Sequence, residues 1–427
     1  MSMCRTAQTR KMRIAAIVEY FPPRLGGDRR IYELLKRLPS EKYEVTFLAL
    51  PASYTLFIKE IDKEPLPDSE TCIGGIRGVI IGYPRSLLKL WHRAFVPAYV
   101  VTLAYVLGKA LIAMIRLSPD LIIVNNTSVY TGVVGYLMSL STRKRLLVDF
   151  SDLQSEYTFD RVRDRVPLRF HKAVRLTLMV MENVMSRRSC KVITVHTKLL
   201  QEHVENICRK NIVYVPNGVD TEQFNPDAIT APEINTLRRE LQIENTRICG
   251  YTGRIDREIG GEILYETLLL LERRHERIKC LILGEGDPDL LKKIKRLNVV
   301  VYVGLKPAHE VPRYIALADV ILVPYPRTKA SHFVSPLKLF EALAMGKPVV
   351  ASAVSGIRDV ILSGQNGILV DDDPVQWVQT IERILEENSL SNKLATNAIA
   401  TARRYDWRHL SERFEQAIDM ALGASLP

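Results

Sequence analysis

Short apolar runs alternate with longer helical stretches along the chain, and this pattern limits the possible fold more than any other feature of the sequence. Strands joined by helices are typical of a mostly parallel sheet covered by helices on both faces. In the first half we predict strands at Arg13–Glu19, Val45–Ala49, Leu121–Val124, Arg145–Asp149 and Lys191–Val195. In the second half we predict them at Arg247–Tyr251, Lys279–Leu283, Val299–Val303, Val320–Val323 and Pro348–Ala351. Each half therefore indicates one doubly wound α/β domain.

A chain of 427 residues is too long for one compact core. Turn residues gather in "VYVPNGVDTEQFNPDAI", between two periodic regions. We predict a first domain over residues 11–210, a second over 211–404, and a last segment, 405–427, that forms a helix and crosses back to the first domain. Ligands of open parallel sheets bind beyond the carboxyl ends of the strands, so we expect a site in a cleft where the two domains face each other.

The net charge of +11 belongs to the first half of the chain. Residues 1–210 hold 33 Lys and Arg against 19 Asp and Glu, a balance of +14, whereas the remainder holds 26 against 29, a balance of −3. A basic half suits nucleic acid, an anionic membrane or a phosphorylated substrate. Aromatic residues make up only 7%, and no zinc-finger, RNP-like or basic-zipper pattern is present, so we expect no nucleic-acid partner.

The six cysteines have no CxxC spacing, which indicates buried thiols of a reducing compartment rather than a disulfide or zinc framework. We therefore expect a cytoplasmic protein. One apolar run, "AFVPAYVVTLAYVLGKALIAMI" (94–115), approaches the length of a membrane span but is interrupted by Pro97, Gly108 and Lys109. We interpret it as a buried domain helix, with an interfacial helix or a span as the alternatives.

Two places in the first half could approach a ligand. Gly26 and Gly27 follow the first predicted strand and permit close approach of the backbone, next to the free amides of a helix start. The alternative is a strand-to-helix turn that needs a positive φ. Asp152, in "DFSDLQSEY", could face a sugar or cap a helix.

In the second half, Arg254 lies just beyond a predicted strand, in "GYTGRIDREIGG". A guanidinium there could hold a diphosphate through several N–H groups, although a surface arginine in a polar loop would have the same sequence. Gly284 and Gly286 in "LGEGDPDLL" form a lone GxG, which is a weak signal. His332 is a single loop histidine, and we interpret it as incidental.

The stretch "SHFVSPLKLFEALAMGKPVVAS" (331–352) is the strongest candidate site. We expect Ser335 to cap a helix whose first position is Pro336, which leaves the amides of Leu337 and Lys338 for an anion. Lys338 would then lie at the positive end of the helix, where a cation is unfavourable unless something negative binds. Glu341 follows on the same face, and its carboxylate suits a pair of ribose hydroxyls. The alternative is a Lys338–Glu341 pair on a solvated helix.

These stretches, together with "FPPRLGGDRRIYELLKRL", "VPNGVDTEQF", "ALADVILVPY" and "SGIRDVILSGQNGILV", resemble the family 4 glycosyltransferases of GT-B fold over nearly the whole chain. The resemblance implies two Rossmann-like domains and a retaining transfer of a sugar from a nucleotide diphosphate donor to an acceptor hydroxyl, with no cofactor and no metal. By position, it implies that Arg254 binds the donor diphosphate and Glu341 the ribose. The donor would also meet Gly26 and Gly27 and the backbone of Val334, Ser335, Pro336 and Leu337.

The chain departs from the family pattern at three positions. Ile259 replaces the usual lysine after the arginine loop, Phe333 replaces the first acid of a Glu-x7-Glu pattern, and Ser151 replaces a histidine that often touches the sugar. We expect Lys338 to supply the missing cation, so that Arg254, Lys338 and Asp152 are the catalytic candidates. The departures also allow a catalytically silent homologue that acts as a partner subunit or membrane scaffold. A nucleotide-sugar epimerase or hydrolase of the same two-domain fold is the alternative enzyme function.

A cluster of basic residues in the first half precedes the apolar stretch "LTLMVMENVM". The cluster consists of Arg161, Arg163, Arg165, Arg169, Lys172 and Arg175. Such a surface suits anionic lipid head groups or a lipid diphosphate, so we expect a lipid-linked or other glycan acceptor at the inner face of the membrane. A solvated charged face beside a core helix is the alternative.

Overall fold

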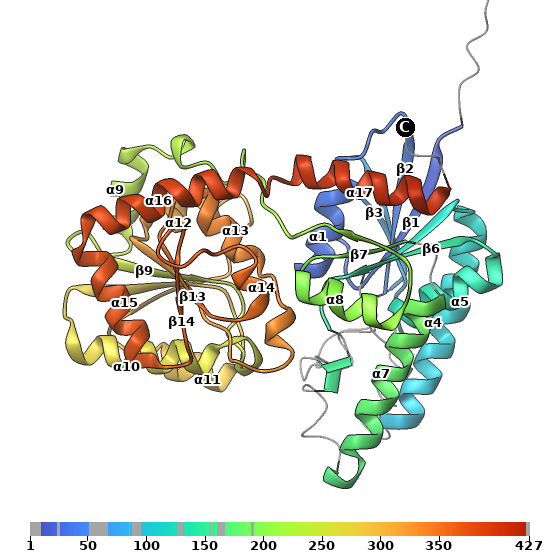
Figure 1. Ribbon diagram of the computed structural model, residues 1–427, viewed down its shortest axis with the longest axis horizontal. Helices are drawn as coiled ribbons and strands as arrows, with labels where there is room; N and C mark the ends of the chain where they lie inside the picture. The colour runs from blue at the N-terminus through green and yellow to red at the C-terminus, as the bar shows by residue number, and fades with distance from the viewer. Residues whose placement is uncertain are drawn as a thin grey trace, which may run out of the picture. The chain divides into compact units, whose positions relative to one another are not determined.

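The computed structural model describes residues 10–23, 26–50, 67–84, 86–87, 95–125, 131–153, 155–156, 158–159, 167–188 and 192–423. The chain forms two compact units (Figure 1). The first contains the described residues within Met1–His196, Leu200–Val215 and Leu410–Pro427, and the second contains Thr197–Leu199 and Pro216–His409.

The first unit is built on an eight-stranded sheet with the order β3-β4-β2-β1-β5-β6-β7-β8. Its strands are β1 (Met12–Val18), β2 (Tyr43–Ala49), β3 (Ser69–Ile73), β4 (Ile76–Ile80), β5 (Leu121–Asn125), β6 (Arg145–Phe150), β7 (Val192–Val195) and β8 (Asn211–Tyr214). All neighbours pair in parallel except β3 with β4. The helices of this unit are α1 (Gly26–Leu35), α4 (Phe95–Leu117), α5 (Thr131–Thr142), η2 (Leu168–Phe170), α7 (His171–Arg188) and most of α8 (Lys198–Ile207).

The second unit has a six-stranded, fully parallel sheet with the order β11-β10-β9-β12-β13-β14. Its strands are β9 (Arg247–Thr252), β10 (Ile278–Leu283), β11 (Val300–Gly304), β12 (Val320–Val323), β13 (Val349–Ser352) and β14 (Ile368–Val370). Its helices are η3 (Pro226–Ala228), α9 (Ala231–Glu240), η4 (Arg257–Ile259), α10 (Gly261–Arg274), α11 (Pro288–Ile294), α12 (Val311–Leu317), η5 (Ser331–Phe333), α13 (Leu337–Ala344), α14 (Ser355–Arg358), α15 (Pro374–Glu386) and α16 (Asn388–Arg403).

Successive residues of the second sheet point to opposite faces, as the pleat requires. Ile321 and Val323 of β12 belong to a core cluster with α9, α12, α13 and α16, whereas Val320 and Leu322 belong to one with α10, α11 and α15. The strands are apolar on both faces because helices cover both sides.

The expected fold class is confirmed, and all ten predicted strands are present, within one or two residues of their predicted ends. The prediction missed β3, β4, β8 and β14. β3 and β4 form an antiparallel hairpin around Gly74 and Gly75, both with positive φ, at the sheet edge, where polar residues are tolerated. β8 lies just before the stretch that we assigned to the domain boundary, and β14 is only three residues long.

From Phe95 onward, the apolar run lies in α4, where some of the described side chains are buried and others are exposed. Within the described ranges, no helix is long and apolar enough to cross a membrane. Cys249 and Cys280 are buried free thiols, but Cys72 is exposed, because it lies on the edge strand β3. Cys4 and Cys190 lie outside the described residues.

A fully buried ion pair fixes α1 to the first sheet. Arg30 donates to both carboxylate oxygens of Asp149, each at 3.0 Å, and to the carbonyl of Val215 at 2.7 Å. Thr194 donates a further hydrogen bond to Asp149 at 2.6 Å. Both charged side chains are completely buried, so their charges are balanced by each other and by these partners.

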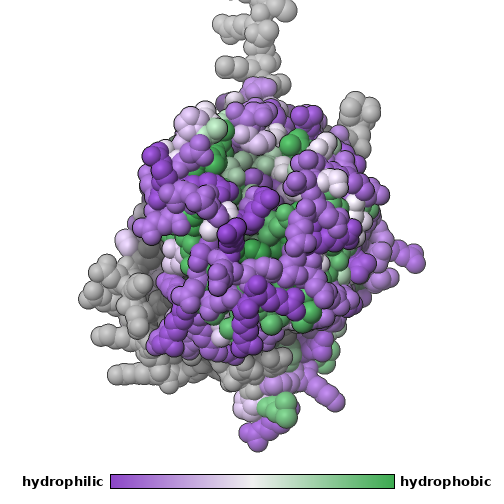
Figure 2. Space-filling model, turned by 90° about the vertical axis from the view of Figure 1, so that its left-hand side faces the viewer, coloured by the Kyte–Doolittle hydropathy of each residue, from purple (hydrophilic) through white to green (hydrophobic). Residues whose placement is uncertain are grey.

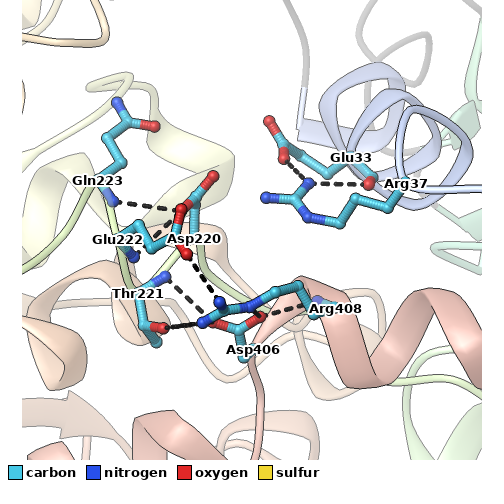
Figure 3. Close-up of polar contacts among 8 residues, drawn as sticks. All are labelled: Glu33, Arg37, Asp220, Thr221, Glu222, Gln223, Asp406 and Arg408. Atoms are coloured by element: carbon cyan, nitrogen blue, oxygen red, sulfur yellow. Dashed lines mark hydrogen bonds and ion pairs between the residues drawn. The ribbon is translucent and has the colours of Figure 1, made fainter.

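The segment that leads into the last helix, α17 (Trp407–Leu422), is held on the second unit by a polar cluster (Figure 3). The backbone of Val219 pairs with Tyr405 and Trp407, and the carboxylate of Asp406 accepts from Thr221 and Arg408. Burial opposes the charge on Asp406, but these hydrogen bonds outweigh it and lower the pKa of the carboxyl to about 2.

From Leu410 onward, α17 belongs to the first unit. Ser411 donates to the carbonyl of Leu34 at 2.7 Å. Lys42 contacts Glu415 at 2.9 Å and Asp419 at 2.7 Å. One helix therefore contributes residues to both units.

Candidate active site

In the second sheet the strand order reverses between β9 and β12, which is the position where open parallel sheets bind ligands. β9 ends at Thr252 and leads into Gly253 and Arg254, while β12 leads into Tyr325. The hydroxyl of Thr252 is buried and has no hydrogen-bond partner in the described part of the chain. The carboxyl ends of β9 and β12 thus form the floor of the candidate site.

The loop that carries Arg254 is fixed by close packing against the loop after β10. The amide of Ile255 donates to the carbonyl of Glu285 at 2.8 Å, and the amide of Asp287 donates to the carbonyl of Ile255 at 3.0 Å. A Cβ atom on Gly284 would lie 1.9 Å from the carbonyl oxygen of Gly253, so no larger residue fits without movement. The weak GxG pattern therefore has a clear structural role, because it allows two backbones to pack directly.

The side chain of Arg254 is about one third exposed and lies between two carboxylates. Its Nε donates to Asp256 at 2.8 Å, and Nη1 lies 3.7 Å from Glu285. Arg254 is therefore not a freely solvated surface residue. Its guanidinium is held in one orientation at the end of β9, and a phosphate would have to compete with Glu285 for it.

Lys338, in the first turn of α13, reaches the same strand end. Its Nζ donates to the hydroxyl of Tyr251 at 3.0 Å and lies 4.1 Å from the centroid of that ring and 5.7 Å from the centroid of Tyr325. The Tyr251 hydroxyl in turn donates to the backbone carbonyl of Arg254. One phenol therefore connects Lys338 to the loop that carries Arg254, although the two cations are 84 positions apart in sequence.

Burial lowers the pKa of the Lys338 ammonium to about 7, although the carboxylates of Glu341 and Asp256 oppose this shift. The two tyrosine rings and the helix start together give the ammonium less stabilisation than water would. Near neutral pH this lysine is close to the midpoint of its titration. A bound anion would favour its charged form.

The start of α13 differs from the prediction. Pro336 is the N-cap residue in an extended conformation, no side chain caps the helix, and Leu337 is the first helical residue. Ser335 does not cap the helix because Pro336 is still extended, which places Ser335 one residue before the N-cap position. The carbonyl of Ser335 accepts from the Asn217 side chain at 2.5 Å. Ser335 is nevertheless buried, and the amide of Leu337 still belongs to the free first turn.

Glu341 lies one turn further along α13 and is 7% exposed, so the alternative of a solvated Lys338–Glu341 surface pair is wrong. Phe333 is buried in η5, and Ile259 packs against the core of this unit. Position 259 is therefore a partly buried apolar residue beside the core. His332 lies 2.8 Å from the hydroxyl of Ser355 and also accepts from the amide of that residue, a contact that fixes the start of α14.

Gly26, Gly27 and Asp152 belong to the first unit. Gly26 and Gly27 are the first residues of α1, and Gly26 does not have the positive φ that the turn interpretation required. Asp28, next to them, accepts from the amides of Glu19 and Tyr20 at 3.1 and 3.0 Å and so holds the β1–α1 loop. Burial and the nearby Glu19 carboxylate raise the pKa of Asp28 strongly. Asp152 follows β6 and is partly buried.

Sequence reasoning missed Tyr251, Asp256, Glu285 and Asn217. Tyr251 and Asn217 lie inside the motifs "GYTGR" and "VPNGVD", so a signal was present, but the partners that they contact are distant in sequence. In the described ranges, no group of three or more His, Cys, Asp or Glu side chains is arranged to hold a metal ion.

Two family models match separate parts of the chain. Residues 26–223 match the model described as Glycosyltransferase Family 4, and residues 246–387 match the model described as Glycosyl transferases group 1. A D-inositol 3-phosphate glycosyltransferase of Xylanimonas cellulosilytica is 32% identical over 208 residues, which are 45% of this chain and 47% of the relative. A protein of the same name from Corynebacterium aurimucosum is 27% identical over 54% of this chain and 56% of its own length. The chain spans about half the length of the curated relatives it matches.

Solved structures share the fold over nearly the whole chain. Sucrose-phosphate synthase of Thermosynechococcus elongatus matches with a TM-score of 0.72 and 19% identity, over 97% of this chain and all of that structure. Anabaena HepE in complex with UDP-glucose matches with a TM-score of 0.70 and 19% identity, over 96% of this chain and all of that one. With two parallel-sheet α/β units and both family models matched in order, the chain belongs to glycosyltransferase family 4 and has the GT-B fold.

Proposed function

We propose that this protein transfers a sugar from a nucleotide diphosphate donor to an acceptor hydroxyl, with retention of the anomeric configuration. The observation that carries the proposal is the connection of Lys338 to the Arg254 loop through the Tyr251 hydroxyl. It holds two cations at the carboxyl end of β9, the place where a sheet of this order binds ligands.

In this proposal, Arg254, Lys338 and the amide of Leu337 bind the donor diphosphate. Glu341 accepts hydrogen bonds from the ribose hydroxyls, and the backbone of Val334–Pro336 lies against the phosphates and the sugar. Anabaena HepE has been solved with UDP-glucose, which makes a uridine diphosphate sugar the first donor to test. Phe333, a buried ring where the family has an acid, removes one hydrogen-bond acceptor and so changes the preferred sugar.

The chemistry follows from the charges. When the glycosidic bond to phosphate breaks, negative charge grows on the leaving diphosphate, and the fixed cations stabilise this state more than the intact donor. The sugar carbon passes through an oxocarbenium-like state, by analogy with glycoside cleavage. The acceptor hydroxyl attacks from the side of the leaving group and gives its proton to the departing diphosphate oxygen, so no protein nucleophile is assigned. Since the two cations supply the positive charge, we propose that turnover requires no metal and is unchanged in EDTA.

We propose a lipid-linked or other glycan as the acceptor, because the first half of the chain carries the excess of positive charge. Asp152 remains the candidate residue of the first unit for the transfer step. Asp152→Ala would test this role in the same transfer assay.

The decisive experiment combines calorimetric titration of UDP and pyrophosphate with a sugar-transfer assay. Arg254→Ala and Lys338→Ala should each weaken binding and turnover at least about tenfold, as expected for the loss of a charge-assisted contact. The matched controls are Arg247→Ala, at the opposite end of β9, and Lys306→Ala, which also removes a lysine from above a tyrosine ring. Wild-type turnover in both site variants would overturn the proposal.

Two further results separate the roles. Glu341→Ala should weaken UDP more than pyrophosphate, because only UDP has a ribose, whereas both ligands lose the support that the Glu341 carboxylate gives to the charged form of Lys338. Nucleotide binding without transfer to any lipid or sugar acceptor would instead support a silent homologue, which the residues at 259, 333 and 151 already suggest.

A further inference from the structure

Helix α7 exposes apolar side chains and buries polar ones, the reverse of an ordinary surface helix. Leu176, Met179, Val180 and Val184 are exposed, and their spacing places them along one face, which we call the α7 stripe. Leu176 is 61% exposed and Val180 50%. Glu182 and Ser186, in contrast, are almost completely buried.

The inner face of α7 is attached to its unit by polar contacts. Glu182 accepts from the amide of Ser155 at 2.8 Å and lies 3.3 Å from His203. Arg175 donates to Glu156 at 2.6 Å. These contacts fix the rotation of the helix, so the α7 stripe cannot turn inward without breaking them.

The apolar surface continues beyond the N-terminal end of the helix. Leu168 and Phe170 of η2 are 82% and 47% exposed. Figure 1 shows α7 extending well beyond the sheet of the first unit. The face of the second unit that Figure 2 presents is, by comparison, mostly hydrophilic with separate hydrophobic areas.

The exposed charges on η2 and α7 have one sign. Arg169, Lys172 and Arg187 are exposed, whereas Glu182, the one acid between residues 168 and 188, is buried. Arg161, Arg163 and Arg165 lie outside the described residues. Over the described residues 168–188, an exposed apolar stripe whose exposed charges are all cationic matches the boundary between anionic head groups and acyl chains.

We propose that α7 and η2 dock the protein on an anionic lipid bilayer, with the α7 stripe in the head-group region and Arg169, Lys172 and Arg187 on the lipid phosphates. A second copy of the chain is less suitable as the occupant, because self-pairing of this face would bring together cations of the same sign. This inference goes beyond the proposed function and does not depend on the donor site.

The test is flotation of the full-length protein with vesicles of phosphatidylcholine alone or mixed with phosphatidylglycerol. The wild-type protein should float with the anionic vesicles, and less so at high salt. Leu176→Ser/Val180→Ser/Val184→Ser should weaken this binding at least about tenfold, since apolar burial scales with area. Arg169→Glu/Lys172→Glu should remove the preference for anionic over neutral vesicles.

The matched control is Leu305→Ser/Leu362→Ser, which removes two exposed leucines from the second unit and should float like the wild type. All variants change exposed residues only, so their melting temperatures and their affinities for UDP should equal those of the wild type. The UDP titration therefore distinguishes a failure of the donor site from a failure of membrane binding. Equal flotation of the stripe variant and the wild type would overturn the proposal. So would a wild-type protein that stays unbound at low salt, or a dimer that the stripe substitutions convert to a monomer in light scattering.

Discussion

Both units place a cation near the carboxyl ends of their strands, but the two cations have opposite surroundings. In the first unit, Arg30 is completely buried and paired with Asp149 and the Val215 carbonyl. In the second, Lys338 faces the rings of Tyr251 and Tyr325 and donates to the Tyr251 hydroxyl, and burial lowers its pKa to about 7. A buried cation whose charge is balanced by protein groups holds the fold together. A buried cation whose charge is only partly balanced, at the sheet edge where ligands bind, favours the binding of an anion.

The largest effect is expected for Asp149→Ala, which tests whether Arg30 needs its carboxylate partner. It leaves Arg30 buried without its carboxylate, which should cost about 3–5 kcal/mol of unfolding free energy. Urea denaturation, followed by hydrogen exchange in the first sheet, would measure the loss. Glu70→Ala is the control, because the Arg77–Glu70 pair is exposed and should contribute less than about 1 kcal/mol. A variant as stable as the wild type would show that Arg30 finds other compensation.

Lys338→Met should have the opposite effect. Affinity for UDP should fall at least about tenfold, because a charge-assisted contact is lost. The second unit should melt at the same or a higher temperature, since the ammonium is only poorly solvated in the folded state. Calorimetry and thermal melting measure the two properties separately. A less stable variant with full affinity would identify Lys338 as a structural residue like Arg30.

The low pKa of Lys338 predicts that both the stability of the second unit and its affinity for anions depend on pH. Lysine in the unfolded chain has a pKa of about 10.4, so between pH 7 and that value the unfolded state binds more protons and the stability contributed by Lys338 rises with pH. Anion binding needs the charged form, so affinity should fall above pH 7, approaching about tenfold per pH unit.

Titrations with UDP between pH 7.5 and 9 avoid the ionisation of the ligand phosphate, whose pKa is about 6. Lys338→Arg is the control, because an arginine stays charged throughout this range. A wild-type affinity that is flat across the range would mean that Lys338 remains charged without a ligand.

The smallest effect is expected at the polar cluster around Asp406 (Figure 3). Arg408 contacts Asp406 at 2.9 Å and Glu222 at 2.7 Å, but its side chain is 55% exposed. Arg408→Ala should cost about 1 kcal/mol in a chemical denaturation of the second unit, because the Asp406 end of the pair is buried but the Arg408 end is exposed to solvent and Thr221 still donates to the carboxylate. A loss of stability as large as that of Asp149→Ala would show that the stability an ion pair contributes does not depend on whether both of its side chains are buried.

The architecture was predictable because the signals that define it are local. The apolar runs of β1 and β9, for example, are continuous and separated from their neighbours by turn residues. The hairpin β3–β4 was missed because an exposed edge strand needs no apolar run, although the Gly-Gly pair at 74–75 was a usable turn signal.

The candidate site was predictable only in part. Lys338 was found because a cation in the first turn of a helix is locally unfavourable, and Glu341 because it follows at helical spacing. Tyr251 was not found, because its role depends on Lys338, which is 87 positions away. The capping role assigned to Ser335 was wrong because Pro336 stays extended and the helix begins one residue later than predicted. The contact of Asn217 with the Ser335 carbonyl, 118 positions away, was also not found. Local rules do not report such distant partners.

Helix α17 has a consequence for how the chain is made. Residues from Leu410 onward complete the packing of a unit whose first strand begins at Met12. A ribosome that has delivered all six strands of the second sheet has still not delivered Ser411, Glu415 or Asp419, which contact Leu34, Lys42 and Tyr43. The second sheet can therefore form during synthesis before the first unit gains the residues of α17.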